Sequence, residues 1–364
     1  MHCSSLGEFE QGRPVMEKIK SEFPNHKLAV SFFSPSGYEI RKDYEGADYI
    51  FYLPLDTPKN AKRLVKLLNP ECLILVKYEY WYNLLSRLQK KKIPVIVISA
   101  VINEDNLFFR PIGSWFRKRI IRINHFFVQE NDSKNLLESI GIEQVTVSGD
   151  TRFDRVKEIR LSEPKLDFIE KFKQNAKLIV AGSTWSDDEE ILISFINDKL
   201  PDDWKLIIAP HNIHEKEIKS LAEKIEKRVA IYTKSHETEI NNAQILIVDT
   251  IGILTKIYAY SEISYVGGGF TKTGVHNTLE PAVFGVPVIF GPNYENYFEA
   301  IDLLENEGAV RFVDSFDFDQ KMSELIENEN ERNRRGKAAS DYIQEKPNSS
   351  EFVMNYLNTI ISKK

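Results

Sequence analysis

The chain has 364 residues, of which 42% are apolar and 28% are charged, and its formal net charge is −6. This length fits two ordinary domains with sizeable cores, and the acidic balance argues against a general nucleic-acid binder. The two cysteines, Cys3 and Cys72, indicate no disulfide framework, and the seven histidines show no metal-ligand spacing. No apolar run reaches the roughly 18 residues that a membrane-spanning helix needs. We therefore expect a cytoplasmic protein with neither a metal nor a nucleic-acid partner.

Short apolar runs alternate with helical patterns through the first half of the chain. The runs that we expect to be strands are residues 27–33, 48–54, 72–77, 94–100, 125–130 and 144–150. Residues 1–5 read as the tail of one more strand, from which we expect that this strand starts upstream of Met1. Strands that alternate with helices predict a parallel sheet covered on both faces.

The same alternation restarts after residues 157–177, a charged stretch that fits a linker and a helix. The second set of expected strands is residues 176–183, 204–210, 228–233, 243–249, 262–268 and 286–291. The sequence thus predicts an α/β protein with two successive doubly wound, Rossmann-like domains, residues 1–155 and 156–339. In the remaining segment, 340–364, we expect an amphipathic helix over residues 340–362 that packs back on the first domain. Ligands of such sheets bind at the carboxyl ends of strands, so we expect a site between the two domains.

Glu8 follows the first expected strand and precedes a helical pattern with Pro14 in its first turn. A carboxylate at the end of a strand can act as a general base if partial burial raises its pKa. The alternative is an acid that caps the helix and interacts favourably with the helix dipole.

Two more polar segments follow strands in the first half. Residues 34–37, Ser-Pro-Ser-Gly, form either an ordinary turn or a contact with a polar ligand. Glu79 follows residues 72–77, and it either accepts a hydrogen bond from a sugar hydroxyl or lies solvated beside an aromatic cluster with Trp81.

Residues 108–127 combine aromatic and aliphatic side chains with a local group of basic ones. The basic residues are Arg110, Arg117, Lys118, Arg119 and Arg122. In an acidic protein this composition favours contact with an anionic membrane surface or a phosphorylated lipid. The alternative is a solvated helix face whose other side lies in the core.

Residues 265–298 are the most informative segment, because two apolar strands there flank three glycines and an expected helix start. Gly267–Gly269 allow close approach to the backbone. We expect a helix from His276, where His276 and Asn277 donate to a phosphate and Glu280 accepts from ribose hydroxyls. Each residue alone has an ordinary structural explanation, but together they predict a nucleotide-phosphate site.

Two other segments could contribute to the same site. Gly182-Ser183-Thr184 follows the first strand of the second half, where hydroxyl side chains contact phosphate or cap a helix. His211 and His214 follow the next strand and either meet a ligand phosphate or form local hydrogen bonds.

Taken together, these segments resemble the 3-deoxy-D-manno-octulosonic acid (Kdo) transferase family. Its members are inverting glycosyltransferases of the GT-B architecture that transfer Kdo from CMP-Kdo to a lipid A precursor, lipid IVA. The matching segments, in the family's order, are residues 5–14, 34–37, 52–56, 79–83, 148–154, 181–185, 249–252, 266–270, 276–281 and 291–297. The resemblance covers nearly the whole chain.

The resemblance implies that Glu8 is the catalytic base, that it faces the donor side from the other domain, and that CMP is the leaving group, with no metal or other cofactor. The residues that we assign to acceptor binding are Ser34, Ser36, Gly37, Glu79, Arg117 and Arg119. Those that we assign to donor binding are Gly182, Ser183, Thr184, His211, Gly267, Gly268, Gly269, Phe270, His276, Asn277, Glu280 and Asn296. The resemblance also implies peripheral attachment to the cytoplasmic face of the inner membrane and a role in lipopolysaccharide synthesis.

The chain departs from the family pattern at several positions. His211 stands where many relatives have arginine, Val275 replaces a glycine beside His276, and residues 99–103 lack an arginine common in relatives. The family's hydrophobic, basic segment ahead of the first strand has no counterpart in this sequence. We therefore expect either a longer natural chain or attachment through residues 108–122.

Two other functions are compatible with the same architecture. One is a sugar-nucleotide epimerase that acts on a soluble substrate, which would not explain residues 108–127. The other is an inactive binding or scaffold protein.

Overall fold

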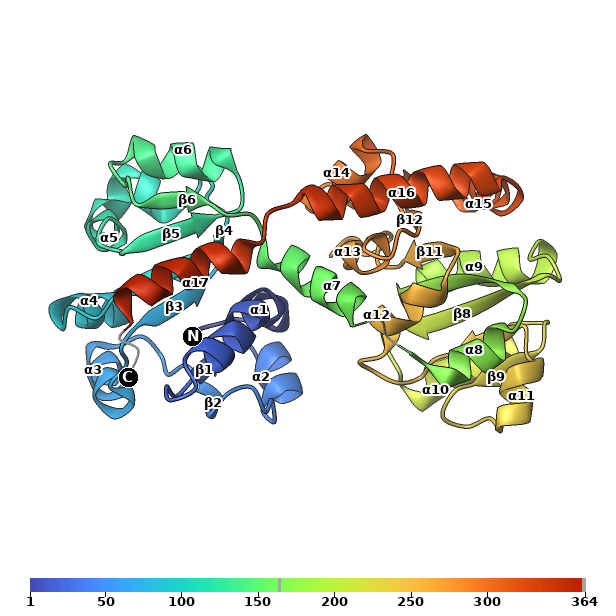
Figure 1. Cartoon of the computed structure of the whole chain (residues 1–364), viewed down its shortest axis with the longest axis horizontal. Coiled ribbons are helices and arrows are strands. Elements are labelled where there is room, and N and C mark those ends of the chain that lie inside the picture. The colour runs from blue at the N-terminus through green and yellow to red at the C-terminus, as the bar shows by residue number, and fades with distance from the viewer. Residues whose placement is uncertain (163–164, 362–364) are drawn as a thin grey trace. The chain divides into compact units, whose positions relative to one another are not determined.

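The computed structural model describes residues 1–162 and 165–361. These residues form two compact units, of which the first contains Met1–Arg155 and the C-terminal segment from Lys346, and the second contains Val156–Glu345. Figure 1 shows a sheet with helices on its faces in each unit. The chain enters the second unit within α7 (Thr151–Leu161) and leaves it after α16 (Glu329–Glu345).

The first unit is built on parallel strands. They are β1 (Ala29–Phe32), β2 (Tyr49–Tyr52), β3 (Leu73–Val76), β4 (Val95–Ala100), β5 (His125–Val128) and β6 (Val145–Val147). Strands β1 and β2 form a pair, and β3 to β6 form a four-stranded sheet in chain order. His2 forms parallel bridges to both Ser31 and Leu75, and so connects the pair to the larger sheet.

The helices of the first unit follow its strands in alternation. They are α1 (Leu6–Glu22), α2 (Pro35–Arg41), α3 (Pro58–Leu68), α4 (Tyr82–Lys90), α5 (Ser114–Ile120), α6 (Asn131–Ser139) and α17 (Ser349–Ile360), with short 3₁₀ turns η1 (Leu107–Phe109) and η2 (Pro111–Gly113). The C-terminal helix α17 buries Val353, Met354 and Leu357 in the same apolar cluster as Met16 and Ile19 of α1.

Two expectations about the start of the chain were wrong in detail. The strand expected over residues 1–5 is limited to the bridge at His2, because Ser5 already serves as the N-cap of α1. Since α1 begins at Leu6, Pro14 lies inside the helix and not in its first turn. Its ring is buried there and leaves one carbonyl of the preceding turn without a backbone donor.

The second unit contains a seven-stranded parallel sheet in the order β13-β12-β11-β7-β8-β10-β9. Its strands are β7 (Lys177–Thr184), β8 (Trp204–Pro210), β9 (Val229–Ile231), β10 (Ile245–Ile247), β11 (Ile263–Val266), β12 (Val288–Phe290) and β13 (Ala309–Arg311). Its helices are α8 (Asp167–Lys173), α9 (Ser186–Asp198), α10 (Glu215–Glu223), α11 (Glu237–Asn242), α12 (Leu254–Ile257), η3 (Tyr258–Tyr260), α13 (Leu279–Ala282), α14 (Phe298–Glu305), α15 (Ser315–Glu327) and α16. The buried central strands β7, β8 and β11 read as continuous apolar runs, as expected for a sheet covered on both faces.

The predicted class, two doubly wound α/β domains, is confirmed, but two elements differ from the prediction. The edge strand β13 was not predicted. In place of the one helix expected over residues 340–362, the structure has two helices, α16 and α17. The last residue of the expected helix, Ser362, lies outside the described part of the chain. Pro347 explains the break, because proline lacks an N–H and disfavours helical geometry in the residue before it.

Among the described residues, none of the helices combines the length and the apolar character needed to cross a bilayer.

Candidate active site

Glu8 lies in the first turn of α1, at the carboxyl edge of the first unit's sheet. The Ser5 side chain caps this helix by accepting a hydrogen bond from the Glu8 amide at 3.5 Å. The Glu8 carboxylate in turn accepts from the backbone amide of Ser4. The cap of α1 is therefore Ser5 and not Glu8, and the bond from Ser4, which precedes the cap, fixes the direction of the Glu8 carboxylate.

Glu8 is nevertheless only 6% exposed, and that burial makes it chemically unusual. Removal from water raises the pKa of the Glu8 carboxyl to about 7, and the nearby charge of Glu79 adds to the increase. The Ser4 amide and Lys77 act in the opposite direction. A carboxylate with a pKa near neutral pH can both accept a proton and release it again.

The Ser-Pro-Ser-Gly turn packs directly on the loop that carries Glu8. The Ser34 amide donates to the Ser4 carbonyl at 2.8 Å. A Cβ added at Gly37 would lie 2.3 Å from the Phe32 ring and 3.0 Å from the Ser5 backbone, so glycine permits this approach. Ser34 caps α2, and its hydroxyl lies 2.9 Å from that of the exposed Ser36. Residues 34–37 are therefore the start of α2 and not a separate turn, and Ser36 is exposed there to a ligand.

Glu79 lies close to Glu8, because the two residues share Ser4. The Ser4 side chain hydrogen-bonds to Glu79, and its amide binds Glu8. Burial raises the pKa of the Glu79 carboxyl as well. Two carboxyl groups with raised pKa values therefore lie side by side at one sheet edge, the kind of pair found at functional sites.

Arg117 and Arg119, which we assigned to acceptor binding, both make contacts within the basic segment. Arg117 donates to the carbonyls of Phe108 and Phe109 at 2.6 and 2.9 Å, and so holds the η1 turn against α5. The Arg119 guanidinium lies over the Tyr82 ring at 5.3 Å. The exposed basic residues of this segment are instead Arg110, Lys118 and Arg122.

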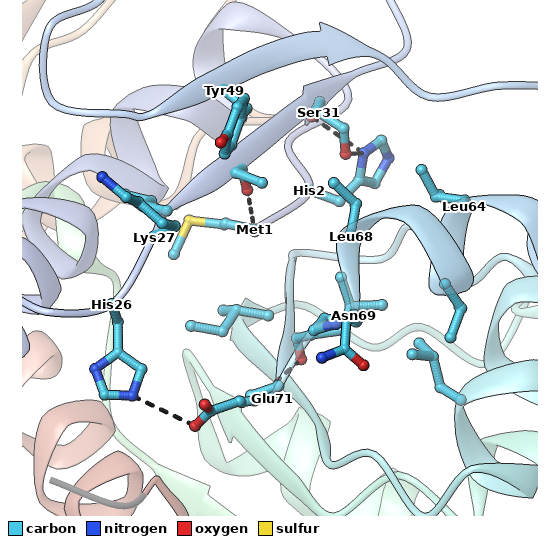
Figure 2. Close-up of a pocket in the computed structure, with 18 of the residues that line it drawn as sticks. Met1, His2, His26, Lys27, Ser31, Tyr49, Leu64, Leu68, Asn69 and Glu71 are labelled. Atoms are coloured by element: carbon cyan, nitrogen blue, oxygen red, sulfur yellow. Dashed lines mark hydrogen bonds and ion pairs between the residues drawn. The ribbon is translucent and has the colours of Figure 1, made fainter. Parts of the chain in front are cut away.

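A cavity of about 630 Å³ lies elsewhere in the first unit. Its lining includes Leu28 and Leu73 near the amino ends of β1 and β3, and Leu68 and Asn69 at the end of α3 (Figure 2). The ion pair of His26 and Glu71, 3.3 Å apart, lies at one side. Neither Glu8 nor Glu79 lines this cavity, so it is separate from the candidate active site.

In the second unit the loop after β11 is joined through its backbone to the end of β7 and to the loop after β12. The Gly267 amide donates to Gly182 at 2.9 Å, and the Asn293 amide donates to Gly269 at 2.8 Å. A Cβ at Gly267 would lie 2.4 Å from the Ser183 carbonyl oxygen, so no other residue fits. Of the three predicted glycines, Gly267 thus lies against residues 182–184, which belong to the end of β7 and do not follow the strand as expected, while Gly269 lies against Gly291.

The buried side chain of Asp188 connects these segments through hydrogen bonds. Asp188 was not predicted individually as a site residue. Its buried carboxylate accepts from the amides of Gly268 and Trp185, both at 2.9 Å, and from the Tyr265 hydroxyl at 2.5 Å. Burial raises the pKa of the Asp188 carboxyl despite these donors. The sequence showed only a run of acids at a helix start, a pattern that does not distinguish a buried anchor from exposed capping acids.

Trp185, His211 and His276 form a compact ring cluster beside the glycine loop. The Trp185 indole nitrogen donates to Nε2 of His276 at 2.9 Å. The His211 ring stacks on Trp185 at 4.4 Å and on His276 at 4.7 Å between centroids. Burial, with a smaller contribution from His211, lowers the pKa of His276 to about 4, so His276 is neutral at neutral pH.

Glu280 and Asn277 are also brought together, but not by the helix that we expected. The helix α13 begins at Leu279 and has only 4 residues, so the expectation of a helix start and its dipole at His276 was wrong. Asn277 instead forms a turn of its own by accepting from the Leu279 amide at 3.2 Å. Glu280 accepts from Asn277 at 3.1 Å and from Thr255 at 2.7 Å, and this orients its carboxylate.

Two of the residues that we assigned to donor binding, Phe270 and Asn296, are not part of the ring cluster or of the Asn277–Glu280 pair. Phe270 packs on the apolar core, with its ring 5.6 Å from that of Phe312. Asn296 lies in the exposed loop between β12 and α14, and within the described residues no hydrogen bond joins it to the glycine loop. Within the described ranges, no group of three or more His, Cys, Asp or Glu side chains could hold a metal ion.

The fold places the chain in a recognised structural class. It is similar to the crystal structure of UDP-GlcNAc 2-epimerase from Neisseria meningitidis, with a TM-score of 0.65, 16% identity and coverage of 98% of each chain. At this identity the similarity shows the fold alone. The chain has the GT-B architecture, a class that includes glycosyltransferases and sugar-nucleotide epimerases.

Sequence comparison separates these two kinds of enzyme. Residues 1–155 match the family model described as 3-Deoxy-D-manno-octulosonic-acid transferase (kdotransferase). The chain is 25% identical to the 3-deoxy-D-manno-octulosonic acid transferase of Haemophilus influenzae, over 100% of this chain and 87% of that one. It is 29% identical to the enzyme of the same name from Aquifex aeolicus, over 90% of this chain and 85% of that one. Residues 1–155 thus match the Kdo transferase model, the chain is similar to Kdo transferases over nearly its whole length, and it is a glycosyltransferase.

Proposed function

We propose that this chain transfers Kdo from CMP-Kdo to a lipid A precursor in lipopolysaccharide synthesis, with Glu8 as the general base. The observation that carries the proposal is the buried Glu8 carboxylate, whose pKa is raised to about 7 at a sheet edge of the first unit. Similarity to the Kdo transferase family supports the choice of sugar and donor.

In the proposed reaction the Glu8 carboxylate removes the proton from an acceptor hydroxyl. The acceptor oxygen then forms a bond to the anomeric carbon of Kdo, while the bond from that carbon to the phosphate oxygen breaks. CMP leaves with the electron pair of the broken bond. Direct displacement of this kind inverts the anomeric configuration, and proton removal by a positioned base contributes on the order of 10²–10⁴-fold to such a step.

The donor would be bound by the loop cluster of the second unit. The glycine loop permits close approach of the departing phosphate to the backbone, where amides other than those of Gly267 and Gly268, which donate to Gly182 and Asp188, are suited to its growing negative charge. Glu280, oriented by Asn277 and Thr255, presents carboxylate oxygens that can accept from ribose hydroxyls. The short α13 adds little dipole, so the proposal assigns phosphate stabilisation to hydrogen-bond donors.

The acceptor would be bound in the first unit. Glu79, close to Glu8 through Ser4, and the exposed Ser36 are suited to sugar hydroxyls. The segment around α5 exposes Ile112 by 78% and Trp115 by 49%, beside the cations Lys118 and Arg122. This combination suits the surface of an anionic membrane, and we propose peripheral attachment to the inner membrane there.

The experiment is to incubate the purified chain with enzymatically generated CMP-Kdo and a tetra-acylated lipid A precursor, and then to record mass spectra of the lipid. The proposal expects a mass increase of one or more Kdo units. A parallel incubation with sugar nucleotides and no acceptor tests the epimerase alternative. An unchanged lipid together with an epimerised nucleotide would overturn the proposal.

A further inference from the structure

The bond between Trp185 and His276 determines which nitrogen of the histidine carries a proton. The indole N–H can only donate, so Nε2 of His276, 2.9 Å away, must be the unprotonated acceptor. A neutral imidazole then carries its single proton on Nδ1. The ring of His276 is therefore a hydrogen-bond donor at Nδ1.

The His276 ring is also held in place on several sides. The Trp185 and His276 rings are nearly parallel, at 8°, and His211 stacks across both. The His276 amide donates to Gly267 at 3.0 Å, and a Cβ at Gly268 would lie 2.8 Å from the imidazole. The ring thus packs on bare glycine backbone, and its orientation is fixed.

Nδ1 of His276 makes no hydrogen bond to any part of the chain that the structure describes. Nδ1 is also not one of the fully buried polar atoms without a partner. A ligand or solvent can therefore reach it. A rigid ring with one fixed, open donor beside a glycine loop is suited to an anionic oxygen.

The first unit also contains a tryptophan that donates to Nε2 of a histidine, but there Nδ1 of the histidine has partners inside the protein. Trp81 donates to Nε2 of His2 at 3.1 Å. Nδ1 of His2, however, lies 3.1 Å from the Ser31 carbonyl and 3.0 Å from the Ser31 hydroxyl (Figure 2). The proton on Nδ1 is used inside the protein at His2, whereas at His276 it is left for another molecule.

We propose that Trp185 is a positioning residue that holds His276 as the Nδ1–H tautomer, so that Nδ1 donates to the phosphate of the bound nucleotide. The inference rests on the proposed function for the identity of that nucleotide, CMP, but the tautomer itself does not. It gives His276 a defined role and adds Trp185, which we had not assigned to the site.

The tautomer is tested by ¹⁵N NMR of the full chain labelled at histidine, with the His276 signals assigned from the spectrum of His276→Gln. The expected spectrum has a protonated Nδ1 and an unprotonated Nε2 at His276. Trp185→Phe keeps the stacked ring but removes the donor, so the His276 signals should move towards a mixture of tautomers. Trp185→Gln keeps an N–H donor without the indole and should retain the Nδ1–H form better than the Phe variant. A protonated Nε2 in the natural chain would overturn the inference.

The role in binding is tested by calorimetric titration with CMP. We expect roughly tenfold weaker binding for Trp185→Phe, the effect of one misplaced hydrogen bond to a charged group. Trp81→Phe, which breaks the matching Trp–His bond in the other unit, should leave CMP affinity unchanged. Equal affinity of Trp185→Phe and the natural chain would overturn the positioning role. If the natural chain fails to bind CMP although His276 has the Nδ1–H form, the proposed function and the phosphate contact are both wrong and the tautomer assignment stands.

Discussion

The backbone amide of Gly268 donates a hydrogen bond of 2.9 Å to the carboxylate of Asp188, 80 residues earlier in the chain. Gly268 has a φ of +90°, which favours glycine, so the loop can adopt this conformation and Asp188 can fix it. The same carboxylate binds the amide of Trp185. The glycine loop and the turn after β7 are therefore fixed to a single buried side chain.

Asp188→Asn should weaken both the second unit and its ligand site. The Gly268 and Trp185 amides bind one carboxylate oxygen and the Tyr265 hydroxyl binds the other. Asparagine replaces the two bonds to a charged oxygen by bonds to a neutral one, and the Tyr265 hydroxyl has to turn from donor to acceptor. We expect a loss of about 2–3 kcal/mol in the free energy of unfolding, measured in urea, and weaker CMP binding. Asp187→Asn, at an exposed neighbour, is the matched control. Unchanged stability of the Asp188 variant would contradict the anchoring role.

Gly267→Ala should damage the second unit because the new Cβ would lie 2.4 Å from the Ser183 carbonyl oxygen. The Ser183 oxygen belongs to the backbone of β7 and the new Cβ would be fixed to the backbone of the neighbouring loop, so relief requires these two segments to separate. The expected loss is about 1–3 kcal/mol, typical of overpacking, and the thermal midpoint measures it. Gly7→Ala is the control, since a Cβ there meets nothing within 4 Å. Equal losses for the two variants would show that the close contact does not govern the effect.

Glu8→Gln should stabilise the first unit at alkaline pH but not at acidic pH. Burial raises the pKa of Glu8 from 4.5 to about 7, so the folded state holds a proton that the unfolded state has released. The folded natural chain therefore loses stability as pH rises through this window, and above it the neutral glutamine should be more stable by about 3 kcal/mol. Urea unfolding at pH 4 and pH 8 measures this difference. A stability difference that does not change between the two pH values would contradict the raised pKa.

Much of the fold could be predicted because the signals are local. The apolar runs around residues 95–100 and 204–210 are long and continuous, and the structure contains β4 and β8 there. The strand β13 was missed because Ala309–Arg311 is a short, partly exposed edge segment whose pairing with β12 is not local in the sequence.

The site was harder to predict than the fold, for a physical reason. Glycine, Glu8 and His276 carry chemistry in their residue type, so they could be selected from the sequence. The roles of Asp188, Trp185 and Ser4 depend on which partner each contacts across the fold, and no spacing encodes those contacts. The expected helix at His276 failed because the side chain of Asn277 caps a local turn in place of the helix.

Lys118→Ala with Arg122→Ala should reduce binding to vesicles that contain anionic lipid. Both side chains are exposed, and each cation near such a surface contributes about 1 kcal/mol. Co-sedimentation with vesicles at low and high salt measures the effect. The double variant Lys62→Ala with Arg63→Ala removes the same charge from exposed positions on α3 and is the control. Similar losses for both double variants would indicate that only net charge matters.

The most direct test of the account is the single-turnover rate of Kdo transfer by Glu8→Gln compared with that of the natural chain, with CMP binding measured on the same samples. Glutamine keeps an oxygen that can accept from the Ser4 amide but cannot take up a proton. We expect a rate lower by on the order of 10²–10⁴-fold with CMP affinity unchanged. Transfer by the variant at a rate close to that of the natural chain would contradict the assignment of Glu8 as the base.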